Sequence, residues 1–262
     1  MEKETVKSKH NHWGIKLLYN AFITVLFAVG TYHQLYVGDF NPHLHYANYF
    51  IERGRSPVQH MVFHRLVIIV KALLPTNLIS GLSYRFSEIV ETHGWEIAGL
   101  ATAILIYLAT AWVLYFILKN SLKLDHTRFS EIKIWTLIVV CLFVMPINFF
   151  FLRERLILGY FSANVLHNPT YILSRVFSLA LFYLCLVWNE KEINLKTGVL
   201  LSVLSLLSTA SKPNFMMAFV PSLVIFFLIK NKSIKRLNYK LLFFVGIPAF
   251  IVLSTQFLMR SS

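Results

Sequence analysis

The chain has 262 residues, of which 56% are hydrophobic and only 14% are charged. A soluble domain carries charge on about a quarter of its residues, so this composition excludes an ordinary water-soluble globule. The 25 lysines and arginines outnumber the 12 acidic residues, which gives a formal net charge of +13. We find no basic helix or aromatic-interleaved basic patch outside the apolar segments and therefore expect no nucleic-acid partner.

The apolar residues are gathered in blocks, and a helix of about 20 apolar residues is long enough to cross the hydrocarbon core of a membrane. We therefore predict an all-α polytopic membrane protein, with residues 1–262 forming a single transmembrane domain of about seven helices. The predicted spans are residues 15–37, 97–118, 134–152, 171–188, 197–210, 214–229 and 241–259. The first is expected to be an uncleaved signal anchor. Lys212 and Pro213 separate the two short spans, which predicts a tight helical hairpin.

The segment 61–74 is apolar but carries His64, Arg65 and Lys71, and charges are costly at the centre of a bilayer. If this segment does not cross, eleven basic residues lie in three short loops on the N-terminal side, as the positive-inside rule asks of cytoplasmic loops. We therefore expect an amphipathic helix at the outer surface, within a long first external loop of residues 38–95. The predicted location is the bacterial plasma membrane, with the N-terminus in the cytoplasm.

The polar residues that insertion does not require are concentrated on the predicted outer side, where seven of the ten histidines lie. Asp39 follows the first span, and a carboxylate there suits a general base at the membrane surface. An aspartate that caps a helix starting at Asn41 and Pro42 is the alternative. His43 and His45 are two residues apart and point to different sides of a helix, so we predict no metal site, and no cofactor is indicated.

The first span is followed by Asp39 in the pattern D-x-x-x-H-x-x-Y-A and then by a segment that opens with His60-Met61-Val62-Phe63-His64. This layout resembles the GT-C class of integral-membrane glycosyltransferases, whose shared core has seven spans and a long first external loop with surface helices. The resemblance covers most of the chain in layout, and its motif is Asp39 with its neighbours. It implies that Asp39 is the catalytic base that deprotonates the acceptor, and that Glu154 is the second acidic residue of the catalytic set, in the second outer loop.

Basic residues on the predicted outer side are candidates for binding a phosphate. Arg153 and Arg155 either anchor the chain at the interface or hold a phosphate with their guanidinium groups. Arg175, four residues into the fourth span, and Lys212, in the hairpin turn, either snorkel to the headgroups or converge on a lipid phosphate. The histidines that complete the predicted substrate-binding set are His43, His64 and His167.

The sequence has no Gly-rich phosphate loop and no Rossmann fingerprint, which favours a lipid-linked donor over a nucleotide sugar. We expect transfer of a sugar from a polyprenyl-phosphate donor to an acceptor at the outer face, in the making of a cell-envelope polysaccharide. The expected partners are membrane lipid, the lipid-linked donor and a further membrane subunit. Enzymes of the resembled class continue beyond their seventh span, so the chain is expected to be a truncated fragment, a minimal member or part of an assembly. The alternatives are a lipid or solute transporter or flippase, and a non-catalytic membrane subunit.

Overall fold

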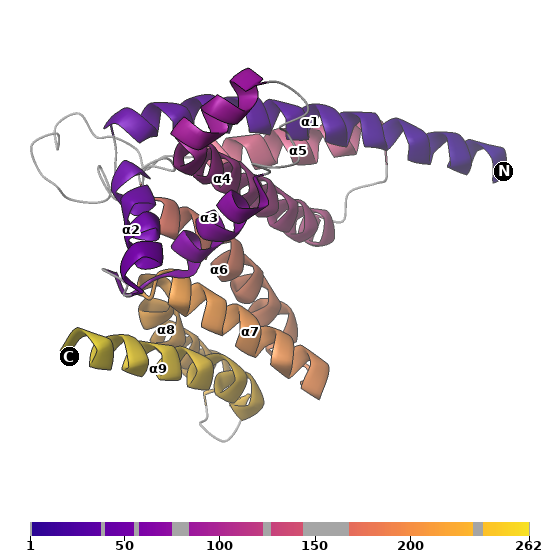
Figure 1. Cartoon of the computed structure of the whole chain (residues 1–262). Coiled ribbons are helices and arrows are strands. Elements are labelled where there is room, and N and C mark those ends of the chain that lie inside the picture. The colour runs from indigo at the N-terminus through magenta and orange to yellow at the C-terminus, as the bar shows by residue number, and fades with distance from the viewer. Residues whose placement is uncertain are drawn as a thin grey trace, which may run out of the picture.

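The computed structural model describes residues 2–37, 40–54, 58–74, 84–122, 127–143, 168–232 and 238–261. In these ranges the chain forms helices and no strands, which confirms the all-α prediction. The helices are α1 (Glu2–Val37), α2 (Phe40–Arg53), α3 (Val62–Leu73), α4 (Tyr84–Leu122), α5 (Arg128–Phe143), α6 (Pro169–Trp188), α7 (Leu195–Ser211), α8 (Asn214–Asn231) and α9 (Tyr239–Ser261). Figure 1 shows α1, α4 and α5 in one group and α6 to α9 in another, with α2 and α3 at one end between them.

Four helices of the described ranges are long and apolar enough to cross a membrane. They correspond to the first, second, fourth and seventh predicted spans, at Trp13–Tyr36, Thr92–Leu122, Pro169–Trp188 and Tyr239–Leu258. Helices α7 and α8 are apolar but shorter, and the chain breaks between them at Lys212 and Pro213 as predicted. Helix α5 is described as far as Phe143, and the rest of the predicted span 134–152 lies outside the described residues. The protein is therefore a membrane protein by its four apolar helices, and seven crossings stay a prediction.

The segment predicted as a long external loop is largely helical where it is described. It contains α2 and α3, and α3 forms over the stretch that was predicted as an amphipathic helix. Helix α4 begins at Tyr84, earlier than the predicted span, and is interrupted at His93, which has φ −118° and ψ 23°. Gly94 follows this break, and a Cβ built there would lie 3.5 Å from Cε of Lys71. The break therefore lies where α3 passes close to the start of the apolar part of α4.

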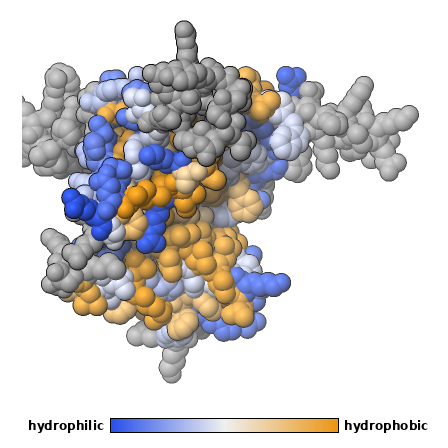
Figure 2. Space-filling model, in the orientation of Figure 1, coloured by the Kyte–Doolittle hydropathy of each residue, from blue (hydrophilic) through white to orange (hydrophobic). Residues whose placement is uncertain are grey.

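Hydrophobic side chains cover much of the outside of the helices, as a lipid-facing surface requires. On α1 the exposed set includes Leu17, Leu18, Phe22, Val25 and Val29. In Figure 2 hydrophobic residues also cover much of the visible surface of the group formed by α6 to α9. Scattered exposed apolar residues are ordinary in soluble proteins, but contiguous faces of this extent are typical of contact with lipid or a partner.

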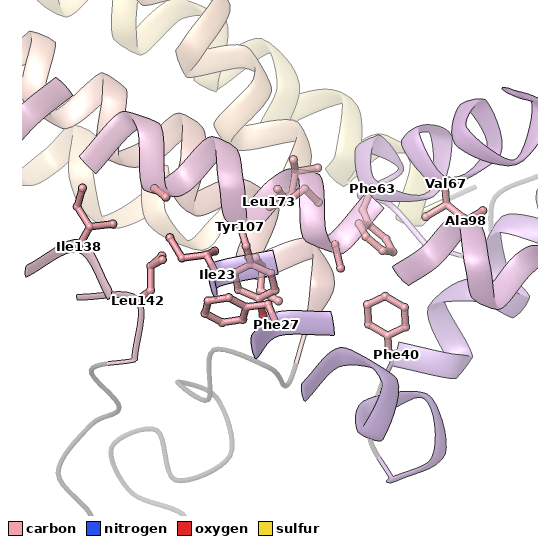
Figure 3. Packing of buried hydrophobic residues seen from close by; sticks show 14 of the residues in the cluster. Ile23, Phe27, Phe40, Phe63, Val67, Ala98, Tyr107, Ile138, Leu142 and Leu173 are labelled. Atoms are coloured by element: carbon pink, nitrogen blue, oxygen red, sulfur yellow. The ribbon is translucent and has the colours of Figure 1, made fainter. Parts of the chain in front are cut away.

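The first core joins α1 to α5 with the start of α6. At its centre the rings of Phe27 on α1 and Tyr107 on α4 stack with centroids 3.7 Å apart, next to Ile23 and Leu173 (Figure 3). Phe27 is 1% exposed. Because lipid tails are as apolar as these side chains, close packing rather than removal from water stabilises such contacts.

The second core joins α6 to α9 through small residues that let the helix backbones approach. Ser178 on α6 and Ser208 on α7 share a hydrogen bond of 2.8 Å. Ser205 on α7 donates to the backbone oxygen of Val245 on α9 at 2.6 Å. A Cβ built on Gly198 of α7 would lie 2.5 Å from the ring of Phe244, so a larger residue there would have to displace this ring where α9 packs on α7.

Lysines at one end of the bundle form ion pairs and cation–π contacts. At the end away from α2 and α3, Lys119 of α4 lies 3.5 Å from Glu131 of α5, and Lys240 of α9 lies 3.5 Å from Glu192. Lys16 of α1 lies 4.9 Å from the ring centroid of Tyr115 at the same end. Lys119 and Lys240, two of the basic residues used to predict the cytoplasmic side, thus form ion pairs at the same end of the fold.

We predict that replacing Phe27 with alanine lowers the free energy of unfolding by about 3 kcal/mol, because it leaves a cavity against Tyr107 that its neighbours fill only partly. Phe22→Ala is the control, since Phe22 lies on the same helix and is 50% exposed. Reversible unfolding of both variants in mixed micelles measures the difference. An equal loss in the two variants would contradict the assignment of Phe27 to the core.

Candidate functional site

Helix α2 is held against α4 by an unusually close approach, and this fixes the polar residues on its inner face. A Cβ built on Gly99 of α4 would lie 2.5 Å from Cδ2 of Leu44 and 2.9 Å from the ring of Phe40. Phe40 also meets Phe63 of α3 edge to face, with centroids 5.9 Å apart. The first turn of α2 is therefore clamped between α3 and α4, directly after position 39 in the chain.

His43 of α2 and His64 of α3 form a buried hydrogen bond between their rings. Nδ1 of His43 and Nε2 of His64 are 3.0 Å apart, and Nδ1 of His64 lies 3.2 Å from the backbone oxygen of His60. His43 is 9% exposed and His64 is fully buried. The structure therefore brings together two of the residues predicted to bind substrate, from segments 21 residues apart.

Lys212, which follows α7 in the other half of the protein, influences the protonation of this pair. Burial lowers the pKa of His43 to about 3, and the nearby rings of His64 and His60 and the positive charge of Lys212 lower it further in the same direction. Burial also lowers the pKa of His64 to about 4. The pKa of His60 is lowered by burial and then by Lys212. The three histidines and Lys212, which we call the histidine–lysine cluster, thus meet with neutral imidazoles at pH 7.

Arg175 lies in a different place, in a cavity between α4, α5, α6 and α8. The cavity has a volume of about 550 Å³ and walls that are mainly apolar. Its residues are Thr110, Leu114, Cys141, Leu142, Tyr171, Ser174, Arg175, Ser178, Leu179, Phe182 and Phe215. Arg175 is the one charged side chain among these, and its guanidinium carbon lies 5.6 Å from the ring centroid of Tyr171.

The two cationic sites lie at about the same level of the bundle. The hydrogen bond between Ser178 and Ser208 pairs the antiparallel helices α6 and α7. Arg175 is three residues from Ser178, and Lys212 is four residues from Ser208, in each case toward the end that carries α3. Lys212 is not among the residues that form the cavity, so these two basic residues belong to different sites.

The described ranges do not include every predicted site residue. Asp39, Arg153, Glu154, Arg155 and His167 lie outside the described residues. The predicted convergence of four cations on one phosphate therefore stays a prediction for the two arginines of the second outer loop. Asn168, which follows His167, caps α6 by accepting hydrogen bonds from the backbone nitrogens of Thr170 and Tyr171.

The structure adds residues that the prediction left out. His60 lies one helical turn before His64, and its Nδ1 is buried without a hydrogen-bond partner among the described residues. The same holds for Oγ of Ser211, next to Lys212. The i, i+4 spacing of His60 and His64 could have identified the first residue. Ser211 gives no such signal, because it is one of several serines in an apolar helix. No three His, Cys, Asp or Glu side chains in the described ranges are arranged to hold a metal ion.

Comparison of the chain with protein-family models, curated proteins and solved structures finds no match.

We predict that acid destabilises the protein through the histidine pair. The folded state keeps His43 and His64 neutral to about pH 3 and 4, whereas the unfolded chain protonates histidines near pH 6.5. The unfolded state therefore binds more protons below pH 6.5, and the free energy of unfolding falls as the pH drops from 6.5 toward 4.

The measurement is the unfolding midpoint in detergent between pH 8 and pH 4. Replacing both histidines of the pair with leucine should flatten this part of the profile, whereas His45→Leu, an exposed position on the same helix, should leave it unchanged. Profiles of the same shape for all three proteins would show that the pair does not govern acid stability.

Proposed function

We propose that the chain is an integral-membrane glycosyltransferase that moves a sugar from a polyprenyl-phosphate donor to a hydroxyl acceptor at the outer face of the membrane. The observation that carries the proposal is Arg175, a charged side chain on an apolar helix that faces a cavity of about 550 Å³. Ionisable residues within membrane helices usually face a cavity and a partner, because a charge in contact with lipid is costly.

The proposed topology has seven crossings, with the N-terminus on the cytoplasmic side of a bacterial plasma membrane. It is supported by the position of three lysines, since Lys119, Lys230 and Lys240 form their ion pairs at the end of the bundle away from the histidine–lysine cluster. The positive-inside rule assigns the lysine-rich end to the cytoplasm. The cluster and the Arg175 cavity are then on or near the outer half.

The chemistry of the cavity suits the phosphate end of a lipid. Its apolar wall residues can contact a hydrocarbon chain, and a guanidinium donates paired hydrogen bonds to phosphate oxygens. The hydroxyl groups of Thr110, Ser174 and Ser178 line the same space. A single cation without an acidic residue among the described wall residues favours a ligand of net negative charge.

The proposed reaction follows from these positions and from the GT-C resemblance. The acceptor oxygen forms a bond to the anomeric carbon while the bond from that carbon to the phosphate oxygen breaks. Asp39 takes the proton of the acceptor hydroxyl, and the polyprenyl phosphate leaves with the bonding electrons. Arg175 stabilises the negative charge of the leaving phosphate. Glu154 is the proposed second acidic residue, and Arg153, Arg155 and His167 are further proposed contacts to substrate.

We predict that Asp39→Asn abolishes sugar transfer and leaves membrane insertion intact, because an amide cannot accept the proton. The assay is transfer of label from a panel of radiolabelled polyprenyl-phosphate sugars in purified membranes. Glu52→Gln is the control, since Glu52 is an exposed carboxylate on the helix that follows. Unchanged transfer by the Asp39 variant would contradict its role as the base. Movement of lipid across the bilayer without any transfer would favour a flippase.

We also predict that Arg175→Gln weakens binding of a polyprenyl phosphate about tenfold or more, because charge-assisted hydrogen bonds to the phosphate contribute about 1.5–3 kcal/mol. Native mass spectrometry of the purified protein with the phosphate and with the neutral prenol measures this. The neutral prenol should bind the wild-type protein and the Arg175→Gln variant equally. Arg65→Gln, at an exposed position of α3, is the control. Equal loss in both arginine variants would show a nonspecific effect of charge.

A further inference from the structure

The hydrogen bonds of the histidine–lysine cluster have a definite direction. The backbone oxygen of His60 can only accept, so the nitrogen of His64 that lies 3.2 Å from it, Nδ1, must carry the hydrogen. A neutral imidazole has one protonated nitrogen, which leaves Nε2 of His64 as an acceptor. The nitrogen of His43 that lies 3.0 Å from it, Nδ1, is then the donor.

These hydrogen bonds leave one ring nitrogen of the two histidines with a lone pair that can accept, and this nitrogen is Nε2 of His43. Both nitrogens of His64 and one nitrogen of His43 are used within the chain, so Nε2 of His43 is the remaining acceptor. This assignment of donors and acceptors holds only if both imidazole rings are neutral. Burial and the positive charge of Lys212 both lower the pKa of His43, so its ring is unprotonated at pH 7. Lys212 therefore helps to keep an acceptor, rather than a cation, at this position.

The surroundings of His43 combine an aromatic ring with further polar groups. The ring of Tyr46, one turn of helix from His43, meets it edge to face with centroids 5.8 Å apart. Nδ1 of His60, within the cluster, and Oγ of Ser211, next to Lys212 in the chain, are buried without a hydrogen-bond partner among the described residues. Buried polar atoms left unpaired cost about 1–3 kcal/mol each, and a ligand with several hydroxyl groups can satisfy such atoms.

We propose that the histidine–lysine cluster binds a hydroxyl group of a saccharide, which donates its hydrogen to Nε2 of His43, and that His64 positions the ring of His43 by fixing its tautomer. Identifying this saccharide as the acceptor of the transfer reaction rests on the proposed function. The hydroxyl binding itself does not, because it follows from the cluster alone. The site is separate from the Arg175 cavity, so it assigns the sugar-binding and lipid-binding tasks to different residues.

Two substitutions at position 43 separate binding from support of the fold. In His43→Asn the side-chain amide nitrogen takes the place of Nδ1, so the bond to His64 is kept and the acceptor at Nε2 is lost. In His43→Gln the longer side chain places an amide oxygen near the position of Nε2 and loses the bond to His64. If the histidine pair only supports the fold, His43→Gln should lower stability and His43→Asn should not. The proposal predicts that asparagine abolishes saccharide binding while stability is kept, and that glutamine retains part of the binding.

The experiment uses the full chain in lipid nanodiscs with 15N-labelled histidine. The signal of His43 is assigned by its loss in His43→Asn, and its Nε2 should have the chemical shift of an unprotonated ring nitrogen at pH 7. Methyl glucoside, methyl galactoside and methyl mannoside are then titrated as probes, with glycerol as a non-cyclic control. At least one glycoside should shift the Nε2 signal, and its apparent Kd should rise tenfold or more in His43→Asn.

A protonated Nε2 in the wild-type protein would overturn the proposal, and this result needs no variant to fold. So would the absence of any response to the three glycosides, or equal binding by wild type and His43→Asn. Because the readout requires no sugar donor, a failed transfer assay would contradict only the function proposed above.

Discussion

The packing of α3 against both halves of the protein is the constraint on which the candidate site depends. Phe63, His64 and Val67 have no exposed surface, and they lie on one face of this short helix. Helix α3 contacts α2 and α4 of the first half and α6 and α7 of the second. The charge of Lys212, at the end of α7, acts on His43 and His60. The placement of one helix at the end of the bundle therefore brings an imidazole from the first half near an ammonium from the second.

Burying imidazoles next to a lysine would be costly if the rings were charged, and this explains the form of the cluster. Desolvation is the largest influence on the pKa of His43 and of His64, and it acts against protonation. The hydrogen bond between the rings satisfies one donor and one acceptor at once, which removes the penalty for burying them as neutral groups. The positive charge of Lys212 opposes protonation of His43 and His60 and lowers the pKa of both.

Hydrophobic blocks and loop charges made the helical class, four of the spans and the break at Lys212 and Pro213 predictable, because these features depend on local composition. The pairing of His43 with His64 was not predictable in geometry, since it requires the approach of α2 to α4 that Gly99 permits. The early start of α4 and its break at His93 were missed for a similar reason. They reflect the passage of α3 beside Gly94, and no local pattern encodes that contact.

Under the two proposals, the separation of Arg175 from Lys212 lets one short membrane protein treat two kinds of polar ligand differently. A guanidinium in an apolar cavity stays charged at every relevant pH and presents several donors, so it selects an anion. A neutral imidazole beside an ammonium presents an acceptor, so it selects a donor such as a hydroxyl group. The two sites are at about the same level of the α6–α7 pair, which the Ser178–Ser208 bond links. In the proposed reaction this bond sets the distance along the helices between a phosphate at Arg175 and a hydroxyl at the histidine–lysine cluster, because neither α6 nor α7 can slide without breaking it.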